Sequence, residues 1–196
     1  MSDFNHFNLI GPLYDRIFGR HEDHKIVEIA ELRVGQTLLD VGGGTGRVTR
    51  LFKKVSKNVI IADSARSMLG EAQKKELRTV NSQSEHLPFG GRTFDRVIMV
   101  DALHHVADQQ TTLNEMWRVT GPGGKIIIEE PDIQHFLVKL VALGEKLLLM
   151  RSHFLSPQAI ARMSRFNDEA SVEIVRKSGI AWIIITREQQ QAEKES

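Results

Sequence analysis

The chain has 196 residues, of which 41% are hydrophobic and 26% are charged. That composition is typical of one globular domain and excludes a collagen-like or wholly disordered chain. Lysine and arginine total 26 against 25 aspartates and glutamates, so the net charge of +1 provides no general attraction to nucleic acid. Cysteine is absent, which excludes disulfides, thiolate zinc sites and thiol redox centres, and favours a cytoplasmic location.

The amino-terminal segment, residues 1–32, has no basic stretch followed by an apolar run, so we predict no signal peptide. Apolar side chains at Tyr14, Ile17 and Phe18, and again from Ile26 onward, predict one or two helices ahead of the first strand. The most apolar segment of the chain, residues 136–150, carries charges and is too short to predict a transmembrane helix.

Beyond residue 33, short β-branched runs alternate with helical patterns, which indicates a parallel sheet with right-handed crossovers. Short β-branched runs of this kind are typical of strands that are buried on both faces of a sheet. We expect strands at residues 37–41, 58–63, 94–101 and 124–130, a weaker strand near 79–82, and helices at residues 46–54, 64–77, 109–119 and 133–150.

The carboxyl-terminal part admits two interpretations. Residues 171–175 alternate in polarity and are rich in β-branched side chains, and an apolar run at residues 182–185 follows the dipeptide Ser178-Gly179. This pattern predicts a β-hairpin. The alternative is a helix over residues 168–177 followed by one strand. We prefer the hairpin because alternation and β-branching favour a strand.

The most informative motif is an acidic, glycine-rich loop, Asp40-Val-Gly-Gly-Gly-Thr-Gly46, between the first expected strand and its helix. Its glycines permit a tight turn and a close approach of a ligand to the backbone. The glycine spacing of dinucleotide folds and the Gly-Lys-Ser/Thr of phosphate loops are both absent. A second acid, Asp63, ends the next strand, where a carboxylate can accept hydrogen bonds from both hydroxyls of a ribose. The alternative is a structural turn whose helix is capped by Asp63.

Five motifs follow one another between residues 12 and 131: LLDVGGGTGRV, IADSARSML, SEHLPF, FDRVIMVDALHHV and WRVTGPGGKIIIEEP. Together they resemble the class I S-adenosylmethionine-dependent methyltransferases, in particular the group that contains the ubiquinone/menaquinone biosynthesis C-methyltransferases. The resemblance implies a Rossmann-like α/β fold, with helices on both faces of a seven-stranded, mostly parallel sheet in the order 3-2-1-4-5-7-6. It also implies a helical lid over residues 1–32 and a methyltransferase domain over residues 33–188, and the low-complexity composition of residues 189–196 predicts a disordered tail.

The resemblance implies S-adenosylmethionine as the cofactor. Asp40 and the glycines fall on positions that contact its methionine half, and Asp63 falls on the acid that binds its ribose. Gln83 stands where many relatives have an aspartate against adenine, but its amide oxygen can still accept a hydrogen bond. The predicted cofactor residues are Asp40, Gly42, Gly43, Gly44, Gly46, Asp63, Ser64, Gln83, Ser84, Asp101 and Ala102.

The predicted catalytic residues are titratable side chains beside this set. His104 and His105 follow Asp101, and an imidazole has a near-neutral pKa that suits removal of a proton from an acceptor. The alternative for both histidines is a structural role. The pair Tyr14-Asp15 is similar to one in family members and makes Tyr14 a third candidate, with helix packing as its alternative. The acids after the fifth strand lack ligand spacing, so we predict no metal site.

Two segments outside the shared motifs, residues 4–32 and 132–166, are predicted to hold the methyl acceptor. Their aromatic and aliphatic side chains suit a small, apolar or aromatic molecule, methylated at carbon or oxygen. The broad apolar face expected for residues 133–150 must be covered by the lid, the acceptor, a second subunit of a homodimer or a membrane surface.

Two other functions compete with this prediction. The first is methylation of protein or nucleic acid, and the near-zero net charge argues against nucleic acid as a partner. The second is a cofactor-binding relative without catalysis. The presence of both Asp40 and Asp63 argues against that, because a decayed site would lose these acids first.

Overall fold

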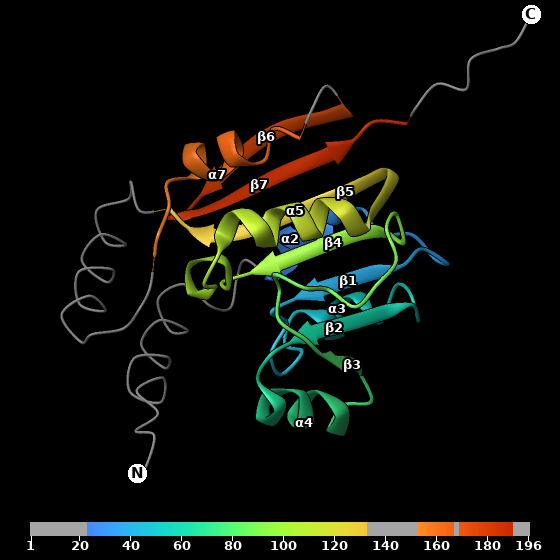
Figure 1. Cartoon of the computed structure of the whole chain (residues 1–196). Coiled ribbons are helices and arrows are strands. Elements are labelled where there is room, and N and C mark those ends of the chain that lie inside the picture. Colours follow the sequence, from blue (N-terminus) through green and yellow to red (C-terminus); the bar gives the residue numbers. More distant parts are fainter. Residues whose placement is uncertain (1–22, 133–152, 167–168, 190–196) are drawn as a thin grey trace, which may run out of the picture.

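The computed structural model describes residues 23–132, 153–166 and 169–189 (Figure 1). Its strands are β1 (Leu38–Val41), β2 (Val59–Asp63), β3 (Arg78–Asn81), β4 (Phe94–Val100), β5 (Thr120–Pro131), β6 (Ala170–Lys177) and β7 (Ile180–Arg187). They form one sheet in the order β3-β2-β1-β4-β5-β7-β6. Strands β1 to β5 run parallel, and β7 is antiparallel to both β5 and β6. The predicted sheet order is confirmed.

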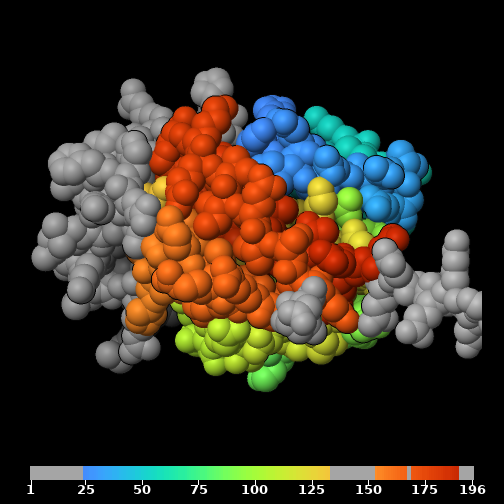
Figure 2. Space-filling view, turned by 90° about the horizontal axis from the view of Figure 1, so that it is seen from above, coloured from blue at the N-terminus to red at the C-terminus, as the bar shows by residue number. Residues whose placement is uncertain are grey.

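Helices cover both faces of the sheet. They are α2 (Asp23–Ala30), α3 (Thr49–Phe52), α4 (Arg66–Lys74), α5 (Gln109–Val119) and α7 (Pro157–Met163), with a 3₁₀ turn at Leu103–His105. Ile26 of α2 and Phe52 of α3 are buried in the core on one face, and Leu113 of α5 and Ile160 of α7 in the core on the other. Figure 2 shows α2 in blue and α5 in yellow-green on opposite sides of β6 and β7.

Local sequence explains where several elements begin. All four residues of β1 are buried, as expected for a strand covered on both faces. Asp108 caps α5 by accepting the Thr111 N–H, and Ser156 caps α7 by accepting the Ala159 N–H, with Pro157 in the first helical turn. These helix starts need no tertiary contact to define them.

The carboxyl-terminal hairpin is confirmed, and the alternative helix over residues 168–177 is wrong. Strands β6 and β7 pair up to Lys177 opposite Ile180, leaving Ser178 and Gly179 as the two residues of the turn. Both have positive φ, 53° and 82°, as a tight hairpin turn requires.

Two helices are shorter than predicted, because residues with positive φ lie next to their ends. Gly46 has a φ of 74°, so α3 starts at Thr49 and not at residue 46. Glu76, with a φ of 56°, lies just beyond the end of α4. The fifth strand is longer than expected and begins at Thr120.

The predicted lid falls only partly within the described residues. Its last portion, residues 23–32, packs into the core through Ile26, Ala30 and Leu32 and belongs structurally to the domain. Residues 1–22, the helix expected over residues 133–150 and most of the predicted tail lie outside the described residues.

Candidate cofactor and active site

A cleft of about 920 Å³ lies at the carboxyl ends of β1, β2 and β4. In a parallel sheet this edge is where loops from neighbouring strands converge on a ligand. The predicted site residues in its lining are Gly42, Gly44, Asp63, Ser64, Gln83, Ser84, Asp101, Ala102 and His105. A smaller hollow of about 200 Å³ shares the glycine loop and is lined in addition by Asp40, Gly43 and Arg47.

Asp63 connects the glycine loop to the start of α4. Its Oδ2 accepts the Gly44 N–H at 2.8 Å and its Oδ1 accepts the Ala65 N–H at 2.7 Å. The carboxylate thereby performs the structural role that the alternative interpretation gave it. It also lines the cleft, so its remaining lone pairs can face a ligand.

Asp40 is a buried carboxyl beneath the glycine loop. Its Oδ2 accepts the Thr49 hydroxyl at 2.5 Å, whereas its Oδ1 is buried without a hydrogen-bond partner in the described part of the chain. Burial raises the pKa of Asp40 to about 7, and the Thr49 bond opposes that rise. A buried oxygen without a hydrogen-bond donor is uncommon, and a positively charged group of a bound ligand would supply the donor that Asp40 Oδ1 lacks.

The loop glycines serve different purposes. A Cβ on Gly43 would lie 2.6 Å from the Asp40 carboxyl carbon, so only glycine lets the loop close over this acid. Gly46 lies outside the lining of both cavities: a Cβ there would come within 2.2 Å of Leu77 and 3.0 Å of Ile61. Gly44 is open, since a Cβ there would meet only Asp63 Oδ2 at 3.9 Å.

This contrast predicts opposite results for two valine substitutions. Gly44→Val should leave a folded protein that no longer binds the cofactor, because the new side chain extends into open ligand space, and the φ of 52° should cost it part of its stability, since a β-branched residue is strained there. Gly46→Val should unfold the protein or destabilise it by roughly 3 kcal/mol, because the side chain collides with the core. Urea unfolding and calorimetry with S-adenosylhomocysteine separate the two effects. Normal binding by a folded Gly44→Val protein would contradict the assignment.

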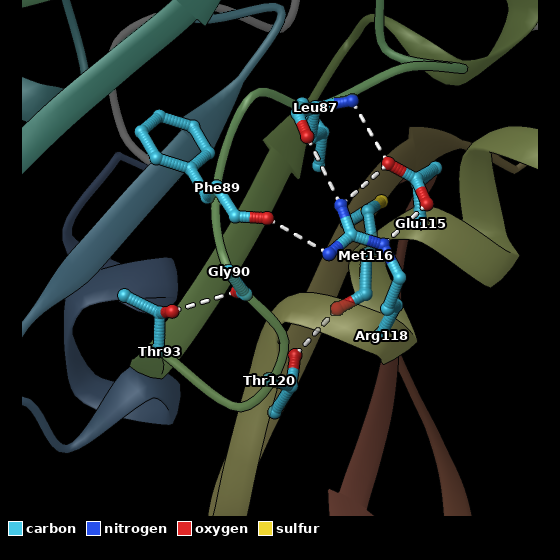
Figure 3. A network of polar contacts seen from close by, with 8 residues as sticks. All are labelled: Leu87, Phe89, Gly90, Thr93, Glu115, Met116, Arg118 and Thr120. Atoms are coloured by element: carbon cyan, nitrogen blue, oxygen red, sulfur yellow. Dashed lines mark hydrogen bonds and ion pairs between the residues drawn. The ribbon is translucent and has the colours of Figure 1, made fainter.

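The segment 82–89 that carries Gln83 and Ser84 is fixed at both ends. At one end Glu85 Oε1 accepts the N–H groups of Ala107 and Asp108. At the other, Glu115 of α5 accepts the Leu87 N–H, and Arg118 pairs with Glu115 while donating to the carbonyl groups of Leu87 and Phe89 (Figure 3). The polar side chains of this segment therefore face the cleft from a rigid support.

His105 lines the cleft beside Asp101 and Ala102, and His86 of the segment 82–89 lines it as well. Asp101 has a φ of 50°, an uncommon conformation for a residue with a side chain, and its N–H donates to the Glu129 carbonyl of β5. The His105 side chain keeps an exposed edge, but loss of surrounding water, and secondly repulsion from His104, lower its pKa to about 4. The imidazole is therefore neutral at pH 7.

His104 lies away from the cleft. It is buried, and its Nδ1 lies 2.5 Å from Oε2 of Glu130. Tyr14, the third predicted catalytic residue, is outside the described residues. Among the described residues, no group of three or more histidines, aspartates and glutamates could hold a metal ion. None of the described helices combines the length and the hydropathy needed to cross a bilayer.

Sequence reasoning missed several residues of the site. Met68 and Arg47 both line the smaller hollow, and Met68 also lines the main cleft. Met68 is 40% exposed, whereas the neighbouring Leu69 is buried and anchors α4 to the sheet. Helical spacing alone could have separated these two neighbours, because adjacent positions on a helix point in different directions. Thr49, the partner of Asp40, gave no such signal.

Comparison with known proteins agrees with this geometry. Residues 39–128, which run from β1 to β5 and contain the whole cleft lining, match the methyltransferase domain family. The fold and this match thus identify a class I S-adenosylmethionine-dependent methyltransferase domain. Within that class, the chain is similar to the group that contains the ubiquinone/menaquinone biosynthesis C-methyltransferases.

The curated relatives include two enzymes of that name. The one from Haemophilus ducreyi is 33% identical over 145 residues, covering 64% of this chain and 56% of the relative. The one from Citrobacter koseri is 34% identical over 142 residues, covering 63% and 57%. The chain therefore spans little more than half the length of these relatives.

Solved structures show the same fold. A methyltransferase from Haloferax volcanii, solved in complex with the activator Trm112, superposes with a TM-score of 0.78 at 16% identity, covering 91% of this chain and 93% of that one. An S-adenosylmethionine-dependent methyltransferase from Thermotoga maritima gives 0.72 at 20% identity, covering 93% and 98%.

The residues present fit S-adenosylmethionine, the methyl donor of this class. The buried, unpartnered Asp40 Oδ1 suits the ammonium group of the methionine half, and the open surface at Gly44 admits a ligand beside the Asp63 carboxylate. Gln83 and Ser84 line the cleft with groups able to hydrogen-bond to adenine.

Proposed function

We propose that the chain methylates a small, apolar or aromatic acceptor at carbon or oxygen. The observation that carries the proposal is one continuous cleft that joins the cofactor residues Gly44 and Asp63 to a neutral imidazole, His105. At about 920 Å³ it lies near the upper end of the roughly 300–1,000 Å³ typical of ligand sites, which suits a cofactor together with part of an acceptor.

Apolar groups in the cleft support an apolar acceptor. Met99, Ala102 and Val106 line the cleft together with His105. A ring or an alkyl chain could rest on these groups. The curated relatives are named as C-methyltransferases of quinone biosynthesis, and a hydroquinone ring is an acceptor of this chemistry.

In the proposed mechanism this chain binds, orients and removes a proton. The cofactor, when bound, supplies a methyl group on a positively charged sulfur. Asp40 and Asp63 hold the two halves of the cofactor in place, so positioning provides much of the acceleration. Transfer of that methyl group to the acceptor carbon or oxygen would leave the acceptor with a proton to lose. The acceptor's proton passes to the imidazole of His105, which lines the cleft and is neutral at pH 7.

A tritium-transfer assay tests this function. Wild-type protein with labelled cofactor should label a hydroquinone carrying an isoprenoid tail or a phenol, and leave simple amines and a tRNA mixture unlabelled. His105→Ala should reduce turnover by roughly a hundredfold or more with cofactor affinity unchanged, because removal of the base does not touch the cofactor. Labelling of amines or RNA alone would refute the acceptor class, and full turnover by His105→Ala would refute the role of His105.

A further inference from the structure

The carboxyl end of β5 carries two adjacent buried glutamates whose side chains lie on opposite faces of the sheet. Glu129 Oε2 accepts the Trp182 Nε1–H at 2.6 Å on the face covered by α2. Glu130 lies on the face covered by α5, where it reaches the 3₁₀ turn Leu103–His105. The two residues thus form a natural pair for comparison: same strand, same residue type and similar burial.

Both oxygens of Glu130 are used by that one turn. Its Oε1 accepts the Leu103 N–H at 2.8 Å, and its Oε2 lies 2.5 Å from His104 Nδ1. A carboxylate can only accept, so His104 must carry a proton on Nδ1. The side chains of His104 and Glu130 are 7% and 4% exposed, so the bond is sheltered from water and the tautomer of the ring is set.

Further contacts enclose His104, whereas His105 lines the cleft. The Phe154 ring stacks on His104 at 4.3 Å between centroids, and the His153 N–H donates to the His104 carbonyl at 2.8 Å. Gln109 Nε2 donates to the Leu103 carbonyl at 3.0 Å. The imidazole of His105 lies 4.0 Å from that of His104, so the position of one ring limits that of the other.

We propose that Glu130 and His104 are positioning residues, which hold the turn so that His105 presents its imidazole to the cofactor cleft. The inference rests on the proposed function, in which His105 accepts the proton of the acceptor. Stability gives little reason for a buried carboxylate here, because removing it from water costs about as much as its bonds return. A defined ring orientation beside the cleft does give a reason.

Glu130→Gln tests the proposal with little change of shape. The amide oxygen can still accept the Leu103 N–H, but the amide nitrogen would face His104 Nδ1 and force its proton onto Nε2. Imidazole nitrogen signals in histidine-labelled protein, recorded with S-adenosylhomocysteine bound, report both rings without any acceptor. We expect the variant to move the signals of His104 and His105 and to lower turnover by roughly tenfold or more, with cofactor affinity within threefold of wild type. Glu129→Gln, the matched control, should leave both signals and turnover unchanged.

A second pair of variants decides the matter if Glu130→Gln fails to fold. His104→Gln keeps an N–H for Glu130 and should retain most of the turnover and the wild-type His105 signals. His104→Leu leaves the carboxylate without that donor and should lose both. Equal behaviour of these two variants, unchanged His105 signals in Glu130→Gln, or an equal loss of turnover in Glu129→Gln would overturn the proposal. If wild-type protein methylates no acceptor, the proposed function fails, and the histidine signals alone decide whether Glu130 positions His105.

Discussion

Replacing Asp63 with alanine is expected to weaken cofactor binding by roughly 10- to 150-fold, equivalent to about 1.5–3 kcal/mol. The carboxylate does two things that alanine cannot. It accepts the N–H groups of Gly44 and Ala65, which ties the glycine loop to the start of α4, and it lines the cleft where the ribose is expected. Titration calorimetry with S-adenosylhomocysteine measures the loss directly.

The control for this variant is an acid with a similar structural role at the other end of the sheet. Asp95 Oδ2 accepts the Thr37 N–H and the Thr37 hydroxyl, both at 2.8 Å, and it lies outside the lining of the cleft. Asp95→Ala should therefore reduce the free energy of unfolding and leave cofactor affinity near wild type. Equal losses of affinity in both variants would show that Asp63 acts only through the fold.

The sheet could be predicted because its signals are local. Except for β3, the parallel strands contain short apolar runs, and the hairpin is marked by Ser178-Gly179. The edge of the sheet that carries Asp40, Asp63 and Asp101 then follows from topology, since parallel strands end on the same side. For this reason most of the predicted cofactor residues line one cleft.

The features of the site that the sequence did not predict depend on contacts between distant parts of the chain. The bond from His104 to Glu130 spans 26 residues and exists only because β4 and β5 are neighbours in a particular register. Gly46 follows the same logic: its motif suggests ligand contact, but Leu77 and Ile61 show that helix packing requires the glycine. The sequence motif indicates that position 46 must lack a side chain, but it does not indicate which neighbouring residues exclude one.

Asp40 couples cofactor affinity to pH. With a pKa of about 7 it is largely protonated at pH 6, and a neutral carboxyl attracts an ammonium group weakly. Affinity for S-adenosylhomocysteine should therefore fall about tenfold from pH 7.5 to pH 6 in the wild-type protein. His105, with a pKa of about 4, stays neutral over this range and does not contribute. Calorimetry at several pH values should show no such slope in Asp40→Asn, and equal slopes in the two proteins would refute the assignment.

Asp40→Asn should change the free energy of unfolding in the opposite sense to cofactor affinity. The folded pKa of Asp40 lies above its ordinary value of 3.8, so the folded state holds a proton that the unfolded state releases between pH 4 and 7. Its contribution to stability is present below pH 4 and is lost as pH rises through 7. Asp40→Asn removes this loss, because an amide of the same shape can still accept the Thr49 hydroxyl without a charge to bury. At pH 7.5 we expect the variant to be more stable by roughly 2–4 kcal/mol, and to match wild type at pH 4.

Because His105 also titrates, the difference between the wild-type and Asp40→Asn curves of stability against pH is more informative than either curve alone. Its folded pKa is lowered from 6.5, so its contribution to stability is lost as pH falls toward 4, which opposes the trend from Asp40. The two slopes partly cancel in the wild-type protein, and subtraction of the Asp40→Asn curve isolates the carboxyl. Urea unfolding from pH 4 to 7.5 provides both curves. A variant that binds the cofactor poorly yet unfolds at higher urea would show that Asp40 is held charged for the ligand at the expense of the fold, whereas a variant weaker in both respects would show that its charge stabilises the fold.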